Sequence, residues 1–534
     1  MRMLISSNFL KTKIFSLFQI ISKKTWLLLF VLFFTTIFLR YMALRGYKLI
    51  FWFDQARDAY LSQQIINNHD LKIFGPSASG TNDTIYHGVL YYYFVAPFYY
   101  LSNGDPLLPA FALSVLGALG IFPLFFFSKS LFRSNKISWL TVIAFTFSAE
   151  LIQLSHWLSN PSLAVMPLIV FYWSLWETGY KNRKQFIIPL AIALGVCLQS
   201  AIWLVYLFGP LLIAILYNWD QFKETSVFRN WRQLITLVSF TLVIIATILI
   251  GQYMLWHNQI FNLQSLKNNS ETFNIFNQTV NLFSIYLTKN VQSLIPSWPI
   301  ISLVFIYIIF FQLSKQSIKQ KIFFLSWILA PLWLFIIEWR NNIHMLISIE
   351  IAVIMLFATS LIHFWQSKRS ILKIISIIVT IIFVISNLRQ IQIYRNLASN
   401  IFSPQKGTDL SMQKSLIDYT YQQANGEDFS FSIFSNPYGY SITWAYLYNW
   451  YGKQKYSYLP SYVGPDQNGL FGADLLTRSD IPRDHIHFTI IEPGLESVPN
   501  IIYQTFLSEQ EEFGPVIDQK QFGSTFIYTR RIKQ

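Results

Sequence analysis

The chain has 534 residues, of which 53% are hydrophobic and only 12% are charged. A soluble domain carries about 25% charged residues, so the composition excludes an ordinary water-soluble protein. The net charge of +14 does not indicate a nucleic-acid partner, because the lysines and arginines lie in short clusters between apolar spans, where a membrane protein needs them.

The first apolar run, at 26–45, follows a lysine-rich N-terminus and has no clear small-residue cleavage site. This pattern predicts an uncleaved first membrane span and argues against a signal peptide. The loop after it, 46–105, is long and concentrates polar residues. It also carries a group of tyrosines between 91 and 100, which suit the headgroup region of a bilayer.

Within this loop, the segment 53–66 has the spacing of a helix that lies along the membrane surface. On such a helix Asp54 and Asp58 stand one turn apart on one face, with Arg57 beside both. An acid at the edge of the hydrocarbon layer is costly and is a functional candidate by default. Spacing alone favours a plainer explanation, in which Asp54 pairs with Arg57 or caps the start of the helix.

Because a membrane span needs about 20 mostly apolar residues, the apolar runs of this chain predict an α-helical, polytopic membrane protein. The eleven predicted spans lie at 26–45, 106–127, 138–156, 161–178, 186–201, 202–217, 234–253, 295–313, 322–339, 344–363 and 371–388. The stretch 186–217 is broken only by Gln199 and Ser200. We expect a tight hairpin there, because one helix of that length overruns the bilayer.

The C-terminal region, 389–534, has the composition of a soluble domain. Strand patterns occur at 429–434, 487–493 and 525–530, and helical spacing occurs at 441–452 and 501–513. These patterns predict a small α/β domain. The single cysteine of the chain, Cys197, lies in an apolar span, so packing alone must hold this domain together.

Positive charge indicates the orientation of the spans. With the N-terminus in the cytoplasm, each inside segment holds at least three Lys or Arg; these segments are 1–25, 128–137, 179–185, 218–233, 314–321 and 364–373. The outside loop 254–294 holds only Lys267 and Lys289. The contrast follows the positive-inside rule. It predicts a multi-pass protein of the cell inner (plasma) membrane with a cytoplasmic N-terminus and an extracytoplasmic C-terminal domain.

Three motifs carry a resemblance to a known family. They are FDQARD at 53–58, HGVLYYYFVAPFYYLSNGDP at 87–106 and HWLSNPS at 156–162. The chain resembles the polyprenyl-phosphate-sugar-dependent glycosyltransferases of the GT-C fold, in the bacterial branch related to protein O-mannosyltransferases, aminoarabinose transferases and Rgt-type galacturonosyltransferases. The resemblance covers about 1–390 and implies a GT-C-like catalytic domain at 1–388.

The chain also departs from that family. The acidic Asp-Glu pair of the protein mannosyltransferases is Asp54-Gln55 here, and the family's Gln-Leu-His in the fifth span is Gln199-Ser200-Ala201. The late outside loop is RNNIHMLISIE at 340–350, which keeps a histidine and lacks the proline. The lost carboxylate argues against a metal site, and we expect neither a metal nor another cofactor.

The resemblance implies transfer of a sugar from a polyprenyl-phosphate-linked donor to a hydroxyl of a glycan, lipid or protein acceptor on the extracytoplasmic face, with inversion. A polyprenyl phosphate leaves as an anion, so the two-carboxylate scheme of glycosidases is not required. One base must accept the proton of the acceptor. We assign this role to Asp54, with Asp58 as second choice or as an orienting partner.

The departing phosphate requires cations aimed at its growing charge. The outside-facing cations near the membrane are Arg57, Lys72, Lys289 and Arg340, with His87 and His344 as further hydrogen-bond donors. Arg340 is equally explained by an ion pair with Glu338 or by snorkelling. His87 fits a structural role better than a catalytic one.

Two other classes of membrane protein remain as alternatives. A transporter or flippase of lipid-linked sugars usually shows internal repeats or broken helices in mid-membrane, whereas this sequence shows no convincing repeat. An O-antigen ligase or polymerase depends on basic and histidine residues in a long late loop, whereas 254–294 is rich in asparagine. For a third alternative, a non-catalytic scaffold, the carboxylates of the first loop are dispensable.

Overall fold

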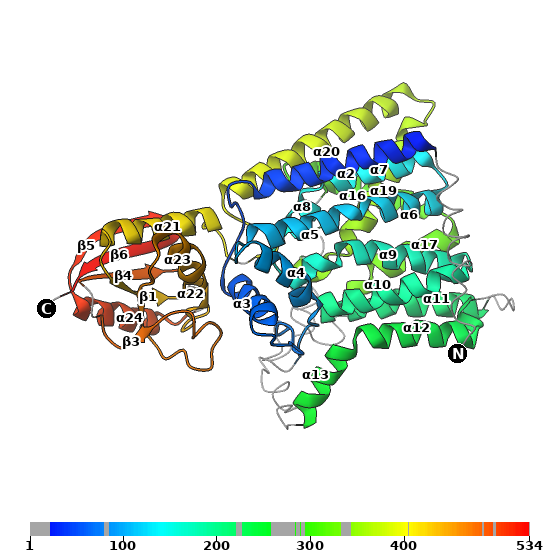
Figure 1. Cartoon of the computed structure of the whole chain (residues 1–534). Helices are drawn as coiled ribbons and strands as arrows, with labels where there is room; N and C mark the ends of the chain where they lie inside the picture. Colours follow the sequence, from blue (N-terminus) through cyan, green and yellow to red (C-terminus); the bar gives the residue numbers. More distant parts are fainter. Residues whose placement is uncertain are drawn as a thin grey trace.

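The computed structural model describes residues 22–78, 85–220, 227–257, 284, 289, 294–332, 343–403, 405–482, 485–494 and 498–532. Over these ranges the chain forms a bundle of helices with a smaller domain, built on a six-stranded sheet, at one end (Figure 1). The fold is therefore mostly helical with a mixed α/β sheet at the C-terminus, as the sequence predicts.

Several helices of the described chain are long and apolar enough to cross a membrane. Three qualify alone: α2 (Lys23–Leu44), the pair α5 and α6 that runs continuously over Leu107–Phe132, and α20 (Ser370–Asn396). Two more qualify as bent pairs. They are α7 (Asn135–Phe147) with α8 (Ala149–His156), bent by 57°, and α12 (Trp231–Ile244) with α13 (Ala246–His257), bent by 62°.

Shorter apolar helices fill the rest of the bundle. They are α9 (Val165–Leu175), α10 (Ile187–Ser200), α11 (Phe208–Asp220), α16 (Pro299–Ser314), α17 (Ile318–Ile328) and α19 (Ile349–Trp365). The long apolar stretch after residue 186 is interrupted where it was expected, because α10 ends at Ser200 and a short 3₁₀ helix, Ile202–Leu207, leads into α11. The structure thus shows several apolar spans, and the total of eleven stays a prediction.

The bend between α7 and α8 is made by Ser148. Its N–H donates to the carbonyl of Ala144 at 2.9 Å and closes α7, and its hydroxyl accepts the N–H of Leu151 at 3.3 Å and opens α8. A serine suits both tasks, because its side chain can satisfy a free amide at the start of a helix. The helix α8 then leads directly into the HWLSNPS junction, where Asn160 donates to the carbonyl of Ser200.

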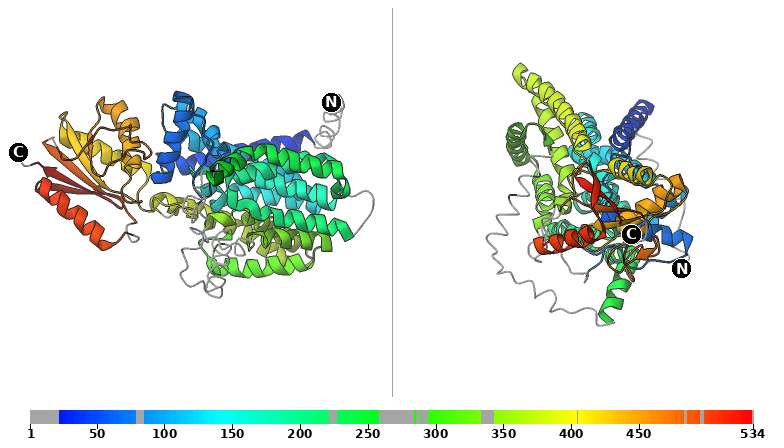
Figure 2. Two further views of the ribbon diagram at one scale, coloured as in Figure 1. Left: turned by 90° about the horizontal axis from the view of Figure 1, so that it is seen from below. Right: turned by 90° about the vertical axis from the view of Figure 1, so that its left-hand side faces the viewer.

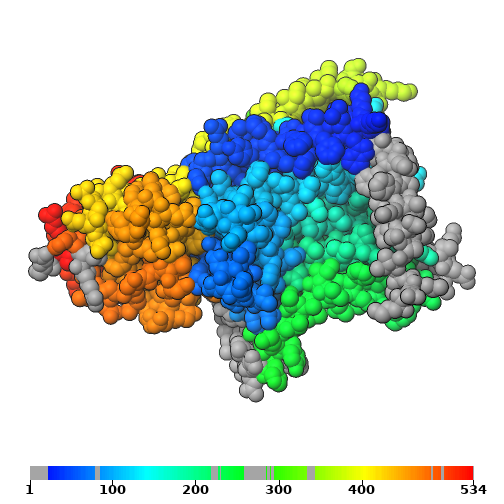
Figure 3. Space-filling view, in the orientation of Figure 1, coloured from blue at the N-terminus to red at the C-terminus, as the bar shows by residue number. Residues whose placement is uncertain are grey.

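Two short helices from the first loop lie at the end of the bundle that faces the C-terminal domain (Figure 3). These are α3 (Phe53–Asn67), which confirms the helix predicted at 53–66, and α4 (Leu90–Leu101). The side chain of Gln55 accepts the N–H of Trp52 at 3.0 Å and so fixes the first turn of α3. The prediction that the tyrosine group sits among lipid headgroups is wrong for part of that group, because Tyr91, Tyr92 and Tyr99 are buried in the core.

The C-terminal domain contains short helices and six strands. In chain order its elements are α21 (Leu410–Ala424), β1 (Phe429–Phe434), α22 (Ile442–Leu447), α23 (Lys453–Tyr456), β2 (Ser461–Val463), β3 (Arg478–Ser479), β4 (Ile486–Ile491), α24 (Asn500–Phe513), β5 (Val516–Phe522) and β6 (Thr525–Arg531). The three strands and two helical segments predicted from periodicity are confirmed. The strands β2 and β3 were missed because two or three residues carry no alternation to detect. The helix α21 and the strand β5 were missed as well, and β5 has no buried side chain.

The order of strands in the sheet is β3-β2-β1-β4-β6-β5. Strand β1 is parallel to both β2 and β4, whereas β6 is antiparallel to β4 and β5. The side chains of β1 alternate between two faces: Phe431 packs in one core with α21, and Phe434 packs in another with Phe506 of α24. The chain leaves β1 toward β2 and returns to β4, so the strand order reverses between β1 and β4.

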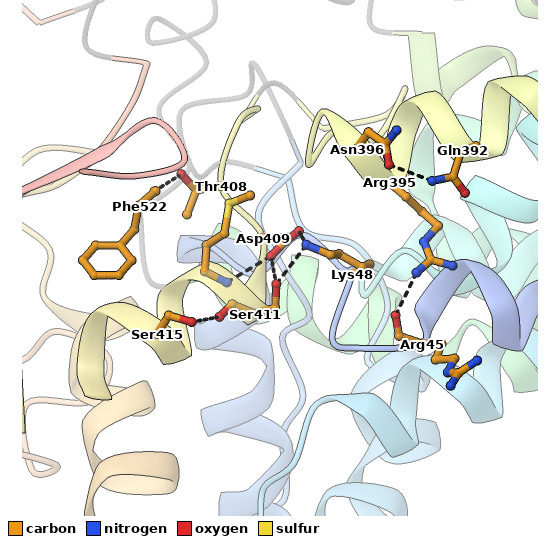
Figure 4. A network of polar contacts seen from close by, with 11 residues as sticks. Arg45, Lys48, Gln392, Arg395, Asn396, Thr408, Asp409, Ser411, Ser415 and Phe522 are labelled. Carbon is orange, nitrogen blue, oxygen red and sulfur yellow. Dashed lines mark hydrogen bonds and ion pairs between the residues drawn. The ribbon is translucent and has the colours of Figure 1, made fainter. Parts of the chain in front are cut away.

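Polar contacts attach this domain to the start of the first loop (Figure 4). The ammonium of Lys48 lies 2.8 Å from Asp409, which also caps α21 by accepting the N–H of Met412 at 3.0 Å. Beside this pair, the guanidinium of Arg395 at the end of α20 donates to the carbonyl of Arg45 at 3.3 Å. Figure 2 shows the result, with α3 and α4 between the bundle and the sheet domain.

Candidate active site

The first turns of α3 bring together the acidic and basic residues that the sequence singled out. One nitrogen of Arg57 lies 2.9 Å from a carboxylate oxygen of Asp54, and another lies 2.8 Å from Asp58. Arg57 and Asp58 follow Asp54 by three and four residues, so both side chains lie on the same face of the helix as Asp54. The hydroxyl of Tyr92 on α4 also donates to Asp58, at 3.2 Å.

The two carboxylates have different surroundings. The side chain of Asp58 is 3% exposed, whereas that of Asp54 is 63% exposed. Burial raises the pKa of Asp58 to about 6, and the guanidinium of Arg57 opposes this rise. Arg57 therefore makes an ion pair with Asp58 in the protein interior and a second ion pair with Asp54 at the exposed surface.

Two cavities lie on either side of Arg57. The smaller has a volume of about 350 Å³ and the larger about 610 Å³. Arg57, Pro76 and Ser77 line both cavities. Pro76 and Ser77, which lie in a turn-rich part of the first loop, therefore form part of the wall between them, together with the guanidinium.

The smaller cavity is lined mainly by polar and aromatic groups around Asp54. They include His87, Trp157, Asn160, Trp203, His344 and Ser403. The imidazole of His344 lies between the two indoles, with ring centroids 6.0 Å and 5.6 Å from those of Trp157 and Trp203. The HWLSNPS junction thus contributes directly to this cavity.

His87 is held as a neutral imidazole at the edge of the smaller cavity. Its Nδ1 accepts the N–H of Ile202 at 3.0 Å, which leaves the proton on Nε2. The pKa of His87 is lowered to about 3, mainly by burial, with smaller contributions from the nearby His344 and Arg57. His87 can therefore donate one hydrogen bond into the cavity and supplies no positive charge there.

The larger cavity contains two cations. Arg57 forms one wall and Lys72 forms another. Lys72 makes an ion pair with Asp70, and its backbone carbonyl accepts the hydroxyl of Tyr93 at 3.1 Å. The remaining lining is mostly aromatic or apolar and includes Phe53, Phe74, Tyr86, Pro437, Tyr440 and Phe471.

The predicted phosphate-binding set is divided by the structure. Lys72 lies in the larger cavity and His344 in the smaller one. Arg340 lies outside the described residues. The expectation that Lys289 is an outside-facing cation is wrong, because its ammonium is buried 2.9 Å from Glu150 and donates to a backbone carbonyl of the bundle.

Sequence reasoning missed several residues of the site. Tyr92, Trp203, Tyr440 and Phe471 line the cavities or contact the acids, and no spacing signal connects them to Asp54. The repeated tyrosines of 91–93 offered one usable signal, because three adjacent tyrosines on a helix cannot all face lipid headgroups. Among the residues that the structure describes, no three His, Cys, Asp or Glu side chains are placed to hold a metal ion.

The sequence matches no model of a protein family and no curated protein. Its structure, however, is similar to solved ones. The crystal structure of ArnT from Cupriavidus metallidurans in the apo state covers 95% of this chain and 98% of its own, with a TM-score of 0.56 and 10% sequence identity. The chain has the ArnT fold. ArnT bound to undecaprenyl phosphate gives the same coverage, with a TM-score of 0.53 and 11% identity.

The ArnT likeness spans both the helical bundle and the C-terminal domain, because it covers nearly the whole of each chain. The resemblance implied by the three motifs is therefore confirmed as a likeness of fold. The Saccharomyces cerevisiae protein O-mannosyltransferase Pmt1-Pmt2 complex bound to the sugar donor is also similar, at 15% identity, but it covers only 45% of this chain and 34% of its own, with a TM-score of 0.31.

Proposed function

We propose that this protein is an integral membrane glycosyltransferase that moves a sugar from a polyprenyl phosphate to a hydroxyl of an acceptor, with inversion. The observation that supports it most is the meeting of two cavities at Arg57, with an exposed carboxylate in one and a second cation in the other. ArnT, which has the same fold, binds undecaprenyl phosphate. A similar lipid phosphate is the donor we expect here.

The larger cavity is proposed to hold the donor. Arg57 and Lys72 both line it, and two cations stabilise the charge that develops on a departing phosphate. Leu71 and Ile73 flank Lys72 at the rim and are 73% and 38% exposed. Exposed apolar residues beside a phosphate-binding lysine suit an isoprenoid chain that leaves the cavity toward the bilayer. Arg340 is retained as a predicted phosphate ligand.

The smaller cavity is proposed to hold the acceptor hydroxyl. Asp54 accepts its proton, and the oxygen then forms a bond to the anomeric carbon of the sugar. The bond from that carbon to the phosphate oxygen breaks, and the phosphate leaves as an anion toward Arg57 and Lys72. Asp58 acts as a positioning residue, because its carboxylate receives two nitrogens of Arg57 and fixes the guanidinium between the cavities.

We infer the orientation of the protein in the membrane from the distribution of its Lys and Arg residues. We propose that residues 1–388 form the membrane-embedded catalytic domain with a cytoplasmic N-terminus, and that 389–534 form an extracytoplasmic domain. The helix α20 continues to Asn396, so the last span extends a little beyond the end that its apolar composition suggested. In this orientation α3 and both cavities face the extracytoplasmic side.

The function is tested by mass spectrometry of envelope glycans and glycolipids from a deletion strain of the host. We expect one sugar to be missing and the wild-type gene to restore it. Asp54→Asn is expected to fail to restore it at wild-type expression. Asp480→Asn is the matched control, because Asp480 is 81% exposed and pairs with Arg478 on the surface of the C-terminal domain. Full restoration by Asp54→Asn would contradict the proposal.

A transporter of lipid-linked sugars is the second candidate function. The two bent helix pairs and the buried Lys289–Glu150 ion pair favour it, since broken helices and intramembrane charges mark transport pathways. Proteoliposomes separate the two functions. A transporter moves a fluorescent undecaprenyl-phosphate sugar across the bilayer without an acceptor, whereas the proposed enzyme leaves the lipid in its leaflet and releases its sugar only to an acceptor.

A further inference from the structure

The C-terminal domain contributes three residues to the larger cavity. Pro437 and Tyr440 lie in the loop after β1, and Phe471 lies in the loop between β2 and β3. Both loops follow the carboxyl ends of parallel strands. In open α/β sheets, ligands bind at this edge, at the point where the strand order reverses, which here is between β1 and β4.

This edge of the sheet is placed against α3. The rings of Tyr440 and Phe53 meet edge to face with centroids 4.9 Å apart, one turn of helix from Arg57. Further contacts hold the domain in place along the same helix. The hydroxyl of Tyr60 donates to Asp474 at 2.7 Å, and the amide of Gln63 donates to the hydroxyl of Tyr446 at 2.8 Å. The domain loops therefore have a fixed position relative to Arg57.

Buried polar groups tie the two loops to each other. Gln467 in the second loop accepts the N–H of Ser441 at 3.1 Å and donates to the carbonyl of Gly439 at 3.0 Å. Ser441 and Gly439, which make these two bonds, are the neighbours of Tyr440 in the chain. Movement of the loop after β1 away from Gln467 therefore breaks both bonds. Gln467 is nearly fully buried, so a lost partner is costly there.

A second anchor fixes the base of the first loop. The carboxylate of Glu492, directly after β4, accepts the N–H of Asn436 at 2.7 Å and the indole N–H of Trp444 at 2.9 Å. Glu492 is buried and lies where β1 and β4 end side by side. Two neighbouring strands thus hold the loop from which Tyr440 reaches the cavity.

The two aromatic side chains that this scaffold presents to the cavity are only partly covered by the protein. Phe471 is 40% exposed and Tyr440 is half-buried, although both lie on rigid loops beside Lys72 and Arg57. Aromatic faces pack well on the C–H faces of a sugar ring, and a tyrosine hydroxyl adds a hydrogen bond. The cavity of about 610 Å³ is much larger than a phosphate group needs.

We propose that the C-terminal domain recognises the sugar of the donor, and that Tyr440 and Phe471 form the surface that contacts a hexose or pentose ring. The inference rests on the proposed function, because it takes the phosphate to lie at Arg57 and Lys72. The isoprenoid chain then leaves past the exposed Leu71 and Ile73. The sugar occupies the remaining part of the cavity, against the loops of the C-terminal domain.

The test compares two affinities of the purified full-length protein. One is for bare undecaprenyl phosphate, and the other is for undecaprenyl phosphate linked to 4-amino-4-deoxyarabinose, mannose or glucose. We expect one sugar-linked lipid to bind the wild type more tightly than the bare lipid. Tyr440→Ala and Phe471→Ala should each weaken binding of that lipid about tenfold, which is about the size of one aromatic contact, and leave binding of the bare lipid unchanged.

Matched variants separate contact with the sugar from damage to the fold. Tyr440→Phe keeps the ring and should retain most of the affinity. Tyr438→Ala removes a tyrosine of the same loop that packs against Phe434 and does not line the cavity, and it should bind both lipids like the wild type. Steady-state kinetics of Tyr440→Ala should show a raised donor KM with an unchanged acceptor KM.

Any of three results with the variants would overturn the inference. The first is that Tyr440→Ala and Phe471→Ala lose the same affinity for the bare lipid as for the sugar-linked lipid. The second is that neither variant loses affinity for either lipid. The third is that Tyr440→Ala raises the acceptor KM and leaves the donor KM unchanged. A wild type that binds no sugar-linked lipid more tightly than the bare one contradicts it as well. The proposed function fails separately, when the wild type does not distinguish undecaprenyl phosphate from undecaprenol, which has no phosphate.

Discussion

The two cavities beside Arg57 are lined by different chemistry. The smaller one contains the exposed carboxylate of Asp54 and two imidazoles, and the larger one contains Lys72, aromatic rings and the loops of the C-terminal domain. Arg57, whose guanidinium pairs with Asp54 and with the buried Asp58, lines both cavities together with Pro76 and Ser77. In the proposed function, the proton acceptor Asp54 and the phosphate-binding cations therefore lie in neighbouring cavities that share Arg57.

Apart from the proposed base Asp54, the largest effect is expected from Arg57 itself. Arg57→Lys keeps a positive charge but cannot reach both carboxylates and the phosphate with a planar fork of donors. We expect kcat to fall about 10²–10³-fold, the usual cost of removing one donor that stabilises developing charge. Steady-state transfer by the purified protein measures it. Arg478→Lys, in a surface ion pair, is the control, and an equally active Arg57→Lys would remove Arg57 from the mechanism.

The next change tests whether the two cavities bind different substrates. Lys72→Met removes one of the two cations of the larger cavity, and we expect the donor KM to rise about tenfold, because a charge-assisted bond contributes about 1.5–3 kcal/mol. The acceptor KM should stay the same. His344→Ala in the smaller cavity should do the reverse. If both variants raise the same KM, the division of the cavities is wrong.

The pH dependence of transfer tests the anchoring role of Asp58. Burial raises the pKa of Asp58 to about 6, so this carboxyl is ionised above pH 6 and becomes protonated below it. Protonation breaks the ion pair with Arg57, and we expect kcat/KM to fall as the pH decreases through about 6. Asp58→Asn should abolish this acidic limb and leave a low, flat rate over the same range. A limb that persists in Asp58→Asn belongs to another group.

The smallest effect is expected at Gln467, whose hydrogen bonds link the two C-terminal loops. Gln467→Ala removes hydrogen bonds worth about 1 kcal/mol each, and the loops that carry Tyr440 and Phe471 gain freedom. We expect the donor KM to rise about fivefold, with kcat and the affinity for bare undecaprenyl phosphate unchanged. Titration with donor lipids measures this. A fall in kcat without a change in KM would place Gln467 outside donor recognition.

Local patterns in the sequence predicted the elements that depend on local spacing. The helix α3, the ion pair of Arg57 with Asp54 and the strand β1 all follow from periods of 3.6 or 2 residues. The ion pair of Arg57 with its neighbour Asp58 does not follow from these periods. The HWLSNPS motif also proved to line a cavity with Asp54, although only a family resemblance had drawn attention to it. The motif shows no periodicity of its own.

The rest of the site depends on contacts between distant parts of the chain. Tyr440 and Phe471 meet Arg57 because the domain is fixed to α3 by pairs such as Tyr60 with Asp474, which are more than 400 residues apart. Nothing in the local sequence indicates such a pairing. The same holds for Lys289, whose burial against Glu150 removes it from the cations that could meet a phosphate. Burial also separates Asp54 from Asp58, which look alike on a helical projection.

Asp54 is the proposed base, and a single-turnover experiment tests that role most directly. Asp54→Asn is loaded with sugar-linked undecaprenyl phosphate, and acceptor is then added in a rapid mix. We predict that the variant binds the donor with wild-type affinity and transfers its sugar about 10²–10⁴-fold more slowly, the range for a missing general base. Transfer at the wild-type rate from the loaded variant would contradict the mechanism.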